Sequence, residues 1–189
     1  MYLFFDTETT GFPKNWNAPH TDTDNWPNLV QIAWMIFNKE GVLKAEADYI
    51  IKPNGYRIPK ASTRIHGVST EQAMAEGVEA RVALQHFVND VTRVETIVAH
   101  NLSFDENVVG AALVRTGIRH TMFDKERICT MKSTVEYCKI VGRYGYKWPK
   151  LIELHQLLFG EGFDDEHDAA ADIRATAKCF WELKKRGIL

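Results

Sequence analysis

The sequence predicts an α/β domain built on a mixed five-stranded sheet, with three antiparallel N-terminal strands, further parallel strands and flanking helices. Three observations support this fold class. Apolar runs of strand length come first, at 2–5, 29–37 and 43–52. Two shorter apolar stretches follow, at 96–99 and around 128–129, and segments with helical spacing separate and follow them. Strands that alternate with helices are typical of parallel pairing.

Length and composition set the limits of this interpretation. The 189 residues fit one domain, 1–189, and the 45 % apolar and 25 % charged content is typical of a globular protein. The formal net charge of −2 provides no global field that attracts polyanions. Contact with nucleic acid would therefore have to be local, or be carried by bound cations.

The cysteines and the N-terminus indicate a compartment. Cys129, Cys138 and Cys179 are widely spaced and form no C-x-x-C motif, which argues against a disulfide framework or a zinc site. The N-terminal residues lack the basic and long apolar regions of a signal peptide, and no segment has the apolar length of a membrane span. We expect a reducing, cytoplasmic location and no membrane partner.

The first strand, Tyr2–Phe5, ends at the segment Asp6–Gly11, which reads D-T-E-T-T-G. Side chains alternate across a strand, so Asp6 and Glu8 point the same way. Two adjacent carboxylates repel each other and are costly to bury unless a cation neutralises them. The motif alone also fits a polar strand end that enters a Thr-Gly turn.

The next segment, Phe12–Asn28, contains three prolines and predicts a loop that is long for a connection. Its run His20–Asp24 fits a metal site or, more simply, a solvated loop. Leu29–Phe37 and Leu43–Lys52 read as two strands joined by a short turn, which completes an antiparallel meander with the first strand.

Helices and a short strand follow the meander. Ser69 and Gln72 have the spacing of a capping box that opens a short helix, and the apolar residues between 84 and 91 have helical spacing. Thr96–Ala99 reads as a buried strand that leads into His100–Glu106. Ser103 and Glu106 again have capping-box spacing, which would place Asp105 in the first turn of a helix. There Asp105 also fits a purely helix-stabilising role.

The segment 125–150 is rich in basic and aromatic residues. Basic groups can neutralise phosphates and aromatic rings can stack on bases, so the segment fits a single-strand surface. A solvated basic face with partly buried aromatics is the alternative. The leucines from Leu151 to Leu158 predict another helix, which Gly160 and Gly162 end.

The last stretch is His167–Asp172, which enters an amphipathic helix with its buried stripe at Ile173, Ala177, Phe180 and Trp181. Five residues along a helix turn through roughly 500°, so His167 and Asp172 would not share a face. We place His167 in the loop before the helix, where it could swing over a site lined by Asp172. A surface histidine and a solvated aspartate are the alternative for this pair alone.

Three motifs together resemble the DnaQ-like, or DEDDh, family of 3′→5′ exonucleases, whose fold is ribonuclease H-like. The first is D-x-E-T-T-G at Asp6–Gly11, the second is H-N-x-x-F-D at His100–Asp105, and the third is H-x-x-x-x-D at His167–Asp172. The segment Ile65–Val68 also resembles the family between the first two motifs. A histidine at position 167, rather than a tyrosine nearer Asp172, indicates the DEDDh branch. The long loop after Gly11 departs from the family pattern.

The resemblance implies a two-metal hydrolysis of phosphodiester bonds, stepwise from the 3′ end, that releases nucleoside 5′-monophosphates. Hard oxygen ligands select Mg²⁺ or Mn²⁺, and a pair of such ions can stabilise the attacking and leaving oxygens. By family analogy Asp6, Glu8 and Asp172 hold one ion, and Asp6 bridges to the second with support from Asp105. His167 is the general base, since a neutral imidazole is basic near neutral pH.

The resemblance also suggests partners. Thr9, Thr10, His66 and Phe104 are candidate contacts to the terminal nucleotide, and His66 before Gly67 fits a ligand contact or a turn equally well. Trp148 is a candidate for its aromatic face alone. We expect a single-stranded 3′ end, with DNA favoured, and a DNA polymerase subunit is a further candidate partner. The alternatives are a catalytically silent nucleic-acid-binding module and an exoribonuclease that trims RNA 3′ ends.

Overall fold

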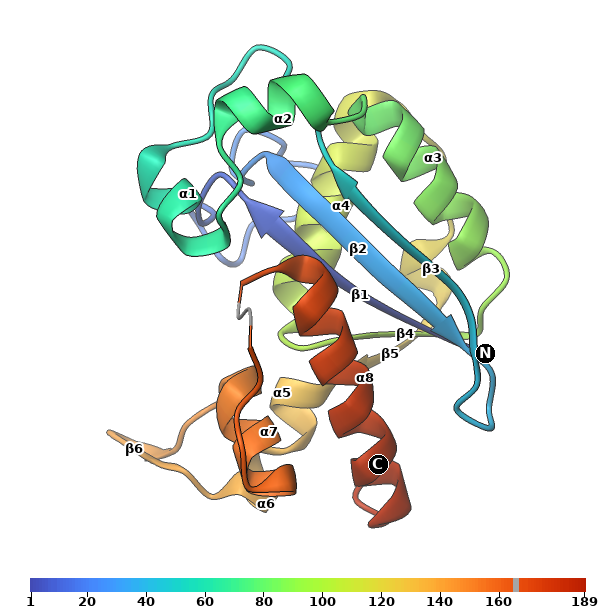
Figure 1. Ribbon diagram of the computed structural model, residues 1–189, viewed down its shortest axis with the longest axis vertical. Helices are drawn as coiled ribbons and strands as arrows, with labels where there is room; N and C mark the ends of the chain where they lie inside the picture. Colours follow the sequence, from blue (N-terminus) through green and yellow to red (C-terminus); the bar gives the residue numbers. More distant parts are fainter. Residues whose placement is uncertain (165–166) are drawn as a thin grey trace.

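The computed structural model describes residues 1–164 and 167–189 (Figure 1). Its strands are β1 (Tyr2–Thr9), β2 (Leu29–Phe37), β3 (Leu43–Ile50), β4 (Thr96–Ala99), β5 (Glu126–Cys129), β6 (Val141–Gly142) and β7 (Gly145–Tyr146). Its helices are α1 (Lys60–His66), α2 (Thr70–Glu76), α3 (Ala80–Val91), α4 (Leu102–Thr116), α5 (Thr130–Ser133), α6 (Val135–Cys138), α7 (Leu151–Phe159) and α8 (Ala169–Lys185), with a 3₁₀ turn, η1, at Met122–Asp124.

The main sheet has the strand order β3-β2-β1-β4-β5, with β1 at its centre. The pairs β1–β2 and β2–β3 are antiparallel, whereas β1–β4 and β4–β5 are parallel. This is the mixed five-stranded sheet that the sequence predicts. Because β1 and β4 run in the same direction, their carboxyl ends lie at the same edge of the sheet, and the first two acidic motifs lie at that edge.

Helices cover both faces of the sheet (Figure 1). Leu3 and Phe5 of β1 point to the face that α3 and α4 cover, where they join the largest hydrophobic cluster of the described residues. Phe4 points to the other face and packs with Ala177 and Phe180 of α8. Side chains alternate along a strand, so the even-numbered positions of β1 face α8. The carboxylates of Asp6 and Glu8 are therefore on the α8 side.

Aromatic packing holds α8 against the sheet. The Phe4 ring lies with its centroid 5.1 Å from that of Phe180 and 5.4 Å from that of Phe37, in both cases edge-on. Trp181 adds edge contacts to Tyr2 and Phe37. Each such pair contributes about 0.5–1.5 kcal/mol beyond its buried area. This packing fixes the first turn of α8 relative to β1, which matters because Asp172 lies in that turn.

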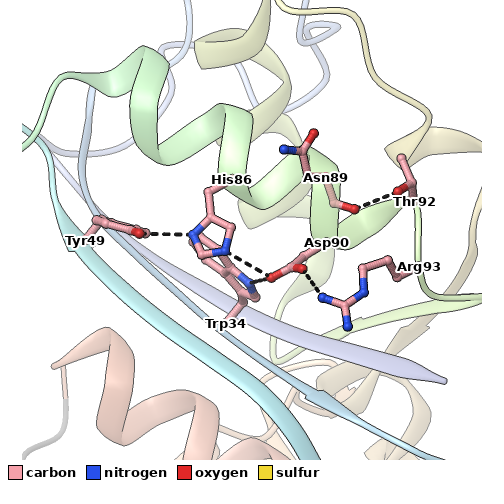
Figure 2. Close-up of polar contacts among 7 residues, drawn as sticks. All are labelled: Trp34, Tyr49, His86, Asn89, Asp90, Thr92 and Arg93. Carbon is pink, nitrogen blue, oxygen red and sulfur yellow. Dashed lines mark hydrogen bonds and ion pairs between the residues drawn. The ribbon is translucent and has the colours of Figure 1, made fainter.

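A polar network on the opposite face attaches α3 to the sheet (Figure 2). The indole Nε1 of the fully buried Trp34 donates to Asp90 Oδ2 at 2.8 Å, and Arg93 pairs with the other carboxylate oxygen at 2.8 Å. His86 Nε2 lies 3.6 Å from Asp90, and its Nδ1 shares a hydrogen bond of 3.0 Å with the Tyr49 hydroxyl. Asp90 thus bridges α3 to β2 and, through His86, to β3.

The strands and helices mostly lie where the sequence predicts them. The bounds of β2 and β4 coincide with the prediction, and α3, α7 and α8 cover the predicted helical segments. Ser69 caps α2 as expected, since its hydroxyl accepts from the Gln72 N–H at 3.0 Å. The long loop at 12–28 contains no helix or strand.

Three local predictions were wrong. β1 does not end at Phe5 but continues to Thr9, because every residue from Asp6 to Thr9 pairs with β2 despite its polar side chain. Helix α4 begins at Leu102 and not after Ser103. Asn101 adopts a left-handed φ of 72° at its N-cap, a conformation that asparagine tolerates. The Ser103–Glu106 capping box is therefore inside the helix, although Asp105 does lie in the first turn.

Of the helices formed by residues 1–164 and 167–189, none combines the length and apolar character that crossing a bilayer requires.

We expect Asp90→Ala to destabilise the protein by about 2–3 kcal/mol, because it leaves the buried Trp34 indole N–H without its acceptor. Urea unfolding monitored by circular dichroism measures this. Asn89→Ala is the matched control on the same helix. It keeps the backbone carbonyl that accepts from Thr92 and should change the free energy of unfolding by no more than about 0.5 kcal/mol. Equal midpoints for the two variants would contradict the bridging role of Asp90.

Candidate active site

Asp6 and Glu8 lie two residues apart on β1, on the face that α8 covers. Asp6 pairs with Ala33 of β2 and Glu8 with Gln31, so both lie in the carboxyl-terminal half of the central strand. Glu8 is only 9 % exposed, and Asp6 is half-buried. The extended conformation that backbone pairing imposes on β1 therefore places two carboxylates side by side at the helix-covered face.

Asp172 and His167 come from the start of α8. Asp168 is the N-cap of this helix, and its Oδ1 accepts from the Ala171 N–H at 2.9 Å. His167 precedes the cap with a left-handed φ of 69°, and its backbone N–H donates to Asp172 Oδ2 at 3.3 Å. His167 thus lies in the turn before the helix, as predicted, with its side chain exposed.

The turn brings His167 and Asp172 to Glu8. One potential ligand atom from each of these three residues lies within 4.8 Å of the other two. These atoms come from β1 and from the start of α8, two segments at opposite ends of the printed sequence. The packing of Phe4 on Phe180 holds the two segments together.

Asp105 approaches β1 from the first turn of α4. It is 3 % exposed, and its Oδ1 accepts from the Thr7 hydroxyl at 2.8 Å. Thr7 lies between Asp6 and Glu8 on β1, so this hydrogen bond ties the second acidic motif directly to the first. After burial, the negative charge of Asp105 is the largest cause of the raised pKa of Asp6. The structure therefore brings together all four acidic residues that the sequence singled out.

The four carboxylates are electrostatically strained without a counter-ion. Burial, followed by the charges of Asp105 and Asp172, raises the pKa of Asp6 well above its usual value. Burial and then the charge of Asp172 raise the pKa of Glu8 to about 9. Burial raises the pKa of Asp105 to about 8, although the hydrogen bond from Thr7 opposes this. A bound cation would favour the ionised forms instead.

The donor set suits a hard divalent cation. Carboxylate oxygens are the ligands that Mg²⁺, Mn²⁺ and Ca²⁺ prefer, and zinc sites more often use histidine and cysteine. The imidazole that lies with Glu8 and Asp172, that of His167, is exposed at the rim of the cluster. Asp6, Glu8, Asp105 and Asp172 therefore fit as ligands, and His167 is better suited to exchange a proton than to bind such a metal.

Thr9 and Thr10 shape the turn that leaves β1. The Thr9 hydroxyl donates to the Gly11 carbonyl at 2.7 Å. The Thr10 hydroxyl accepts from the Asn28 N–H at 2.9 Å, and the Thr10 N–H donates to the Asn28 carbonyl at 3.0 Å. Both side chains thus have a structural task, because they close the base of the 12–28 loop beside the acidic cluster.

His66 lies at the end of α1, close enough to the site for the charge of His167 to lower its pKa, although burial is the larger cause. Its Nδ1 accepts from the Val68 N–H at 3.2 Å, so in the neutral ring Nε2 carries the hydrogen. That buried Nε2 makes no hydrogen bond of regular geometry among the described residues, although the nearby Thr9 backbone partly opposes the lowering of the His66 pKa. A buried donor without a well-aligned partner is costly, and a ligand at the site would offer it one.

Phe104 belongs to an aromatic group at the start of α4. Its ring centroid lies 5.8 Å from that of Trp16 and 6.4 Å from that of Phe12, both in the 12–28 loop. Phe12 is 75 % exposed, and Trp16 is also exposed. Neither Phe12 nor Trp16 was predicted from the sequence to be a site residue. The sequence signal that could have indicated these two residues is the aromatic content of the loop that directly follows the first motif.

Trp148 lies in the segment that follows β7 and is 62 % exposed. The adjoining Pro149 carbonyl accepts from His100 Nε2 at 3.0 Å, which leaves His100 Nδ1 to accept from the Thr130 hydroxyl at 3.0 Å. Burial lowers the pKa of His100 to about 4, so the ring is neutral at physiological pH. His100 thus links the second motif to the segment that carries Trp148.

The model of the exonuclease family (RNase_T) matches residues 3–180. The chain belongs to this exonuclease family. It is a DnaQ-like exonuclease domain, and the resemblance seen in its three motifs is confirmed. A search of curated proteins returned no match to the sequence.

Solved structures of Escherichia coli exonuclease I are similar to this exonuclease domain. A zinc-bound complex with single-stranded DNA is 22 % identical, with a TM-score of 0.74, over 98 % of this chain and 40 % of that one. A complex with a dT13 oligonucleotide is 22 % identical, with a TM-score of 0.76, over 98 % and 41 %. The chain thus spans about two fifths of the length of these relatives, and the likeness establishes the ribonuclease H-like fold.

The raised pKa values of Glu8 and Asp105 predict an unusual pH dependence of stability. Without metal, the folded protein holds these protons to about pH 9 and about pH 8, whereas the unfolded chain releases them near pH ~4. The folded state binds more protons between these limits, so stability falls as pH rises through this window. We expect the Tm in EDTA to fall from pH ~5 to pH ~9, and Mg²⁺ to restore it at the higher pH.

Glu8→Gln should flatten this dependence, because the variant removes one of the carboxyls with a raised pKa. Glu46→Gln, an exposed acid on the edge strand β3, is the matched control and should behave like the unchanged protein. Thermal melts across this pH range measure both. The same pH slope in EDTA for Glu8→Gln and Glu46→Gln would contradict the electrostatic account of the site.

Proposed function

We propose that this chain is a divalent-metal-dependent 3′→5′ exonuclease that removes nucleotides one at a time from single-stranded nucleic acid, with DNA favoured. The observation that carries the proposal is the convergence of Asp6, Glu8, Asp105 and Asp172 beside His167, in a member of an exonuclease family. Residues 1–189 would act as one domain, and the products would be nucleoside 5′-monophosphates.

The four carboxylates would hold two ions of Mg²⁺ or Mn²⁺. When bound, such ions stabilise the charge that develops on phosphodiester oxygens and make a water molecule more acidic. Asp6 is central among the acids, since the charges of Asp105, Asp172 and Glu8 all act on it, and it would therefore be one of the residues that hold the metal. The Thr7–Asp105 hydrogen bond and the Asp168 cap hold the oxygens of the second and third motifs in place.

His167 would accept the proton of the attacking water. The hydrogen bond from its backbone N–H to Asp172 places the ring at the edge of the acidic cluster, and its exposure leaves a path for the proton to solvent. An imidazole that is neutral near pH 7 is suited to this role. The left-handed backbone at His167 orients the side chain before the helix begins.

Five further residues would contact the terminal nucleotide. The Nε2–H of His66, which makes no hydrogen bond of regular geometry, would donate to it, and the half-buried Phe104 ring would stack on its base. The turn closed by Thr9 and Thr10 offers backbone groups at the same edge. Trp148 would provide an exposed aromatic face.

The preference for single-stranded DNA rests on the relatives, because the similar exonuclease I structures contain single-stranded DNA or oligonucleotides. Neither of these exonuclease I structures is described as a complex with a polymerase, so partnership with a polymerase subunit stays a prediction of the resemblance. Discrimination against ribose depends on contacts to the 2′-hydroxyl. Parallel assays on DNA and RNA strands of the same sequence would measure that preference.

A strand labelled at its 5′ end tests the proposed reaction. With Mg²⁺ we expect a ladder of progressively shorter labelled products and release of 5′-monophosphates, and with EDTA none. Asp6→Ala should abolish the ladder without loss of stability, since it also removes a buried, repelled carboxylate. The exposed Glu46→Ala is the control and should retain activity. Undiminished hydrolysis by Asp6→Ala would refute the site.

His167→Ala should lower kcat by about 10²–10⁴-fold, the usual cost of losing a general base. The concentration of Mg²⁺ that gives half-maximal activity should stay nearly unchanged, because carboxylates would hold the metal. His86→Ala, an exposed histidine on α3, is the control. If His167→Ala instead regained full kcat at high Mg²⁺, His167 would be a metal ligand and not the base.

A further inference from the structure

A short hairpin projects from the body of the molecule between α6 and α7 (Figure 1). Strands β6 and β7 pair antiparallel, with Gly142 opposite Gly145, and the Lys147 N–H donates to the Ile140 carbonyl at 2.9 Å. We refer to residues 139–148 as the hairpin arm. Of the residues of this arm, the proposed function uses only Trp148, as a contact to the terminal nucleotide.

The arm exposes large aromatic and apolar side chains. Tyr144 at its tip is 89 % exposed, Val141 is 81 % exposed, and Tyr146 and Trp148 are also exposed. The Arg143 guanidinium lies over the Tyr144 ring, 5.2 Å from its centroid. Aromatic rings displayed in this way are available to stack on bases, which every nucleobase permits through its flat face.

The charge of the arm is positive, in contrast with that of the whole chain. Residues 139–150 contain Lys139, Arg143, Lys147 and Lys150 and no acidic residue, whereas the whole chain has a net charge of −2. Lys147 pairs with Glu153 of α7. Within residues 1–164 and 167–189, no salt bridge involves Lys139, Arg143 or Lys150. Three cations therefore remain available for phosphates.

The base of the arm is attached to the acidic site through His100. The carbonyl of the buried Pro149, which directly follows the arm, accepts a hydrogen bond from His100. His100 directly follows β4 and lies just before α4. The same short connection leads to Phe104 and Asp105 in the first turn of α4. The Lys150 N–H donates to Glu153 at 2.8 Å and fixes the start of α7 on the other side. The arm thus extends from a rigid base next to the second acidic motif.

We infer that the hairpin arm binds the single strand on the 5′ side of the nucleotide being removed, with Lys139 and Arg143 on phosphates and Tyr144 and Tyr146 against bases. This rests on the proposed function, because the strand must enter the acidic site by its 3′ end. Alternating basic and aromatic side chains complement a polyanion with flat bases better than they complement a protein surface. The arm would therefore raise kcat/KM for strands long enough to reach it, relative to shorter ones.

Two substrates of different length test the arm. A dinucleotide is too short to reach beyond the acidic site, whereas a strand of about 20 nucleotides can occupy the arm. We expect Arg143→Ala combined with Tyr144→Ala to lower the ratio of kcat/KM for the long strand to that for the dinucleotide by about tenfold or more. The same variant should reduce the slope of log affinity against log salt by about one, for the one phosphate contact removed.

Lys44→Ala is the matched control, since Lys44 is an exposed cation on β3 at the other edge of the sheet. It should leave both the ratio and the salt slope unchanged. A thermal melt verifies that the arm variant is folded, as expected for substitutions at exposed positions.

The outcomes separate the two proposals. If the unchanged protein hydrolyses neither substrate, the proposed function fails and the arm proposal fails with it. If the unchanged protein hydrolyses both, and the arm variant keeps the same length ratio and salt slope, the proposed function stands and the arm proposal is overturned. The arm would then serve a protein partner or a second copy of the chain.

Discussion

Mutual repulsion among buried carboxylates is the constraint on which the whole arrangement depends. Asp6, Glu8, Asp105 and Asp172 come from one strand and two helices, and burial with like charge raises the pKa values of at least three of them. Such a cluster persists only if the surrounding structure holds it. Hydrophobic packing of α8 and α4 on opposite faces of β1 provides that support. The fold therefore stores an electrostatic cost at the site, which a divalent cation would relieve.

The central place of β1 explains how one strand can serve both faces. Its side chains alternate, so Asp6 and Glu8 face α8 while Thr7, between them, reaches the Asp105 carboxylate on α4. The first acidic motif is thus a connector as well as a set of candidate ligands. Motif residues without a charge have comparable tasks, since Thr10 closes the 12–28 loop and His100 anchors the segment before α7. A hydrogen bond joins the first two motifs, and the third motif lies beside Glu8 of the first.

Much of the fold and the acidic set could be predicted from the sequence, because both leave strong local signals. β2 is a continuous apolar run, α3 and α8 have apolar stripes, and the acids stand in motifs of fixed spacing. Features that depend on distant partners could not be predicted. The polar half of β1 is a strand only because β2 pairs with it, and α1 buries only Ser62 and His66, so it shows no stripe. The left-handed Asn101 and the hairpin arm likewise depend on context beyond their neighbours in sequence.

The order of the elements along the chain also has a consequence for biosynthesis. The ribosome makes β1, with Asp6 and Glu8, well before α8, with His167 and Asp172. The acidic cluster can therefore assemble only when α8 has emerged and docked on β1. A nascent or prematurely terminated chain that lacks α8 would carry Asp6, Glu8 and Asp105 but neither His167 nor Asp172. Long-range pairing of this kind is also slow to form, which extends the interval before the acidic cluster is complete.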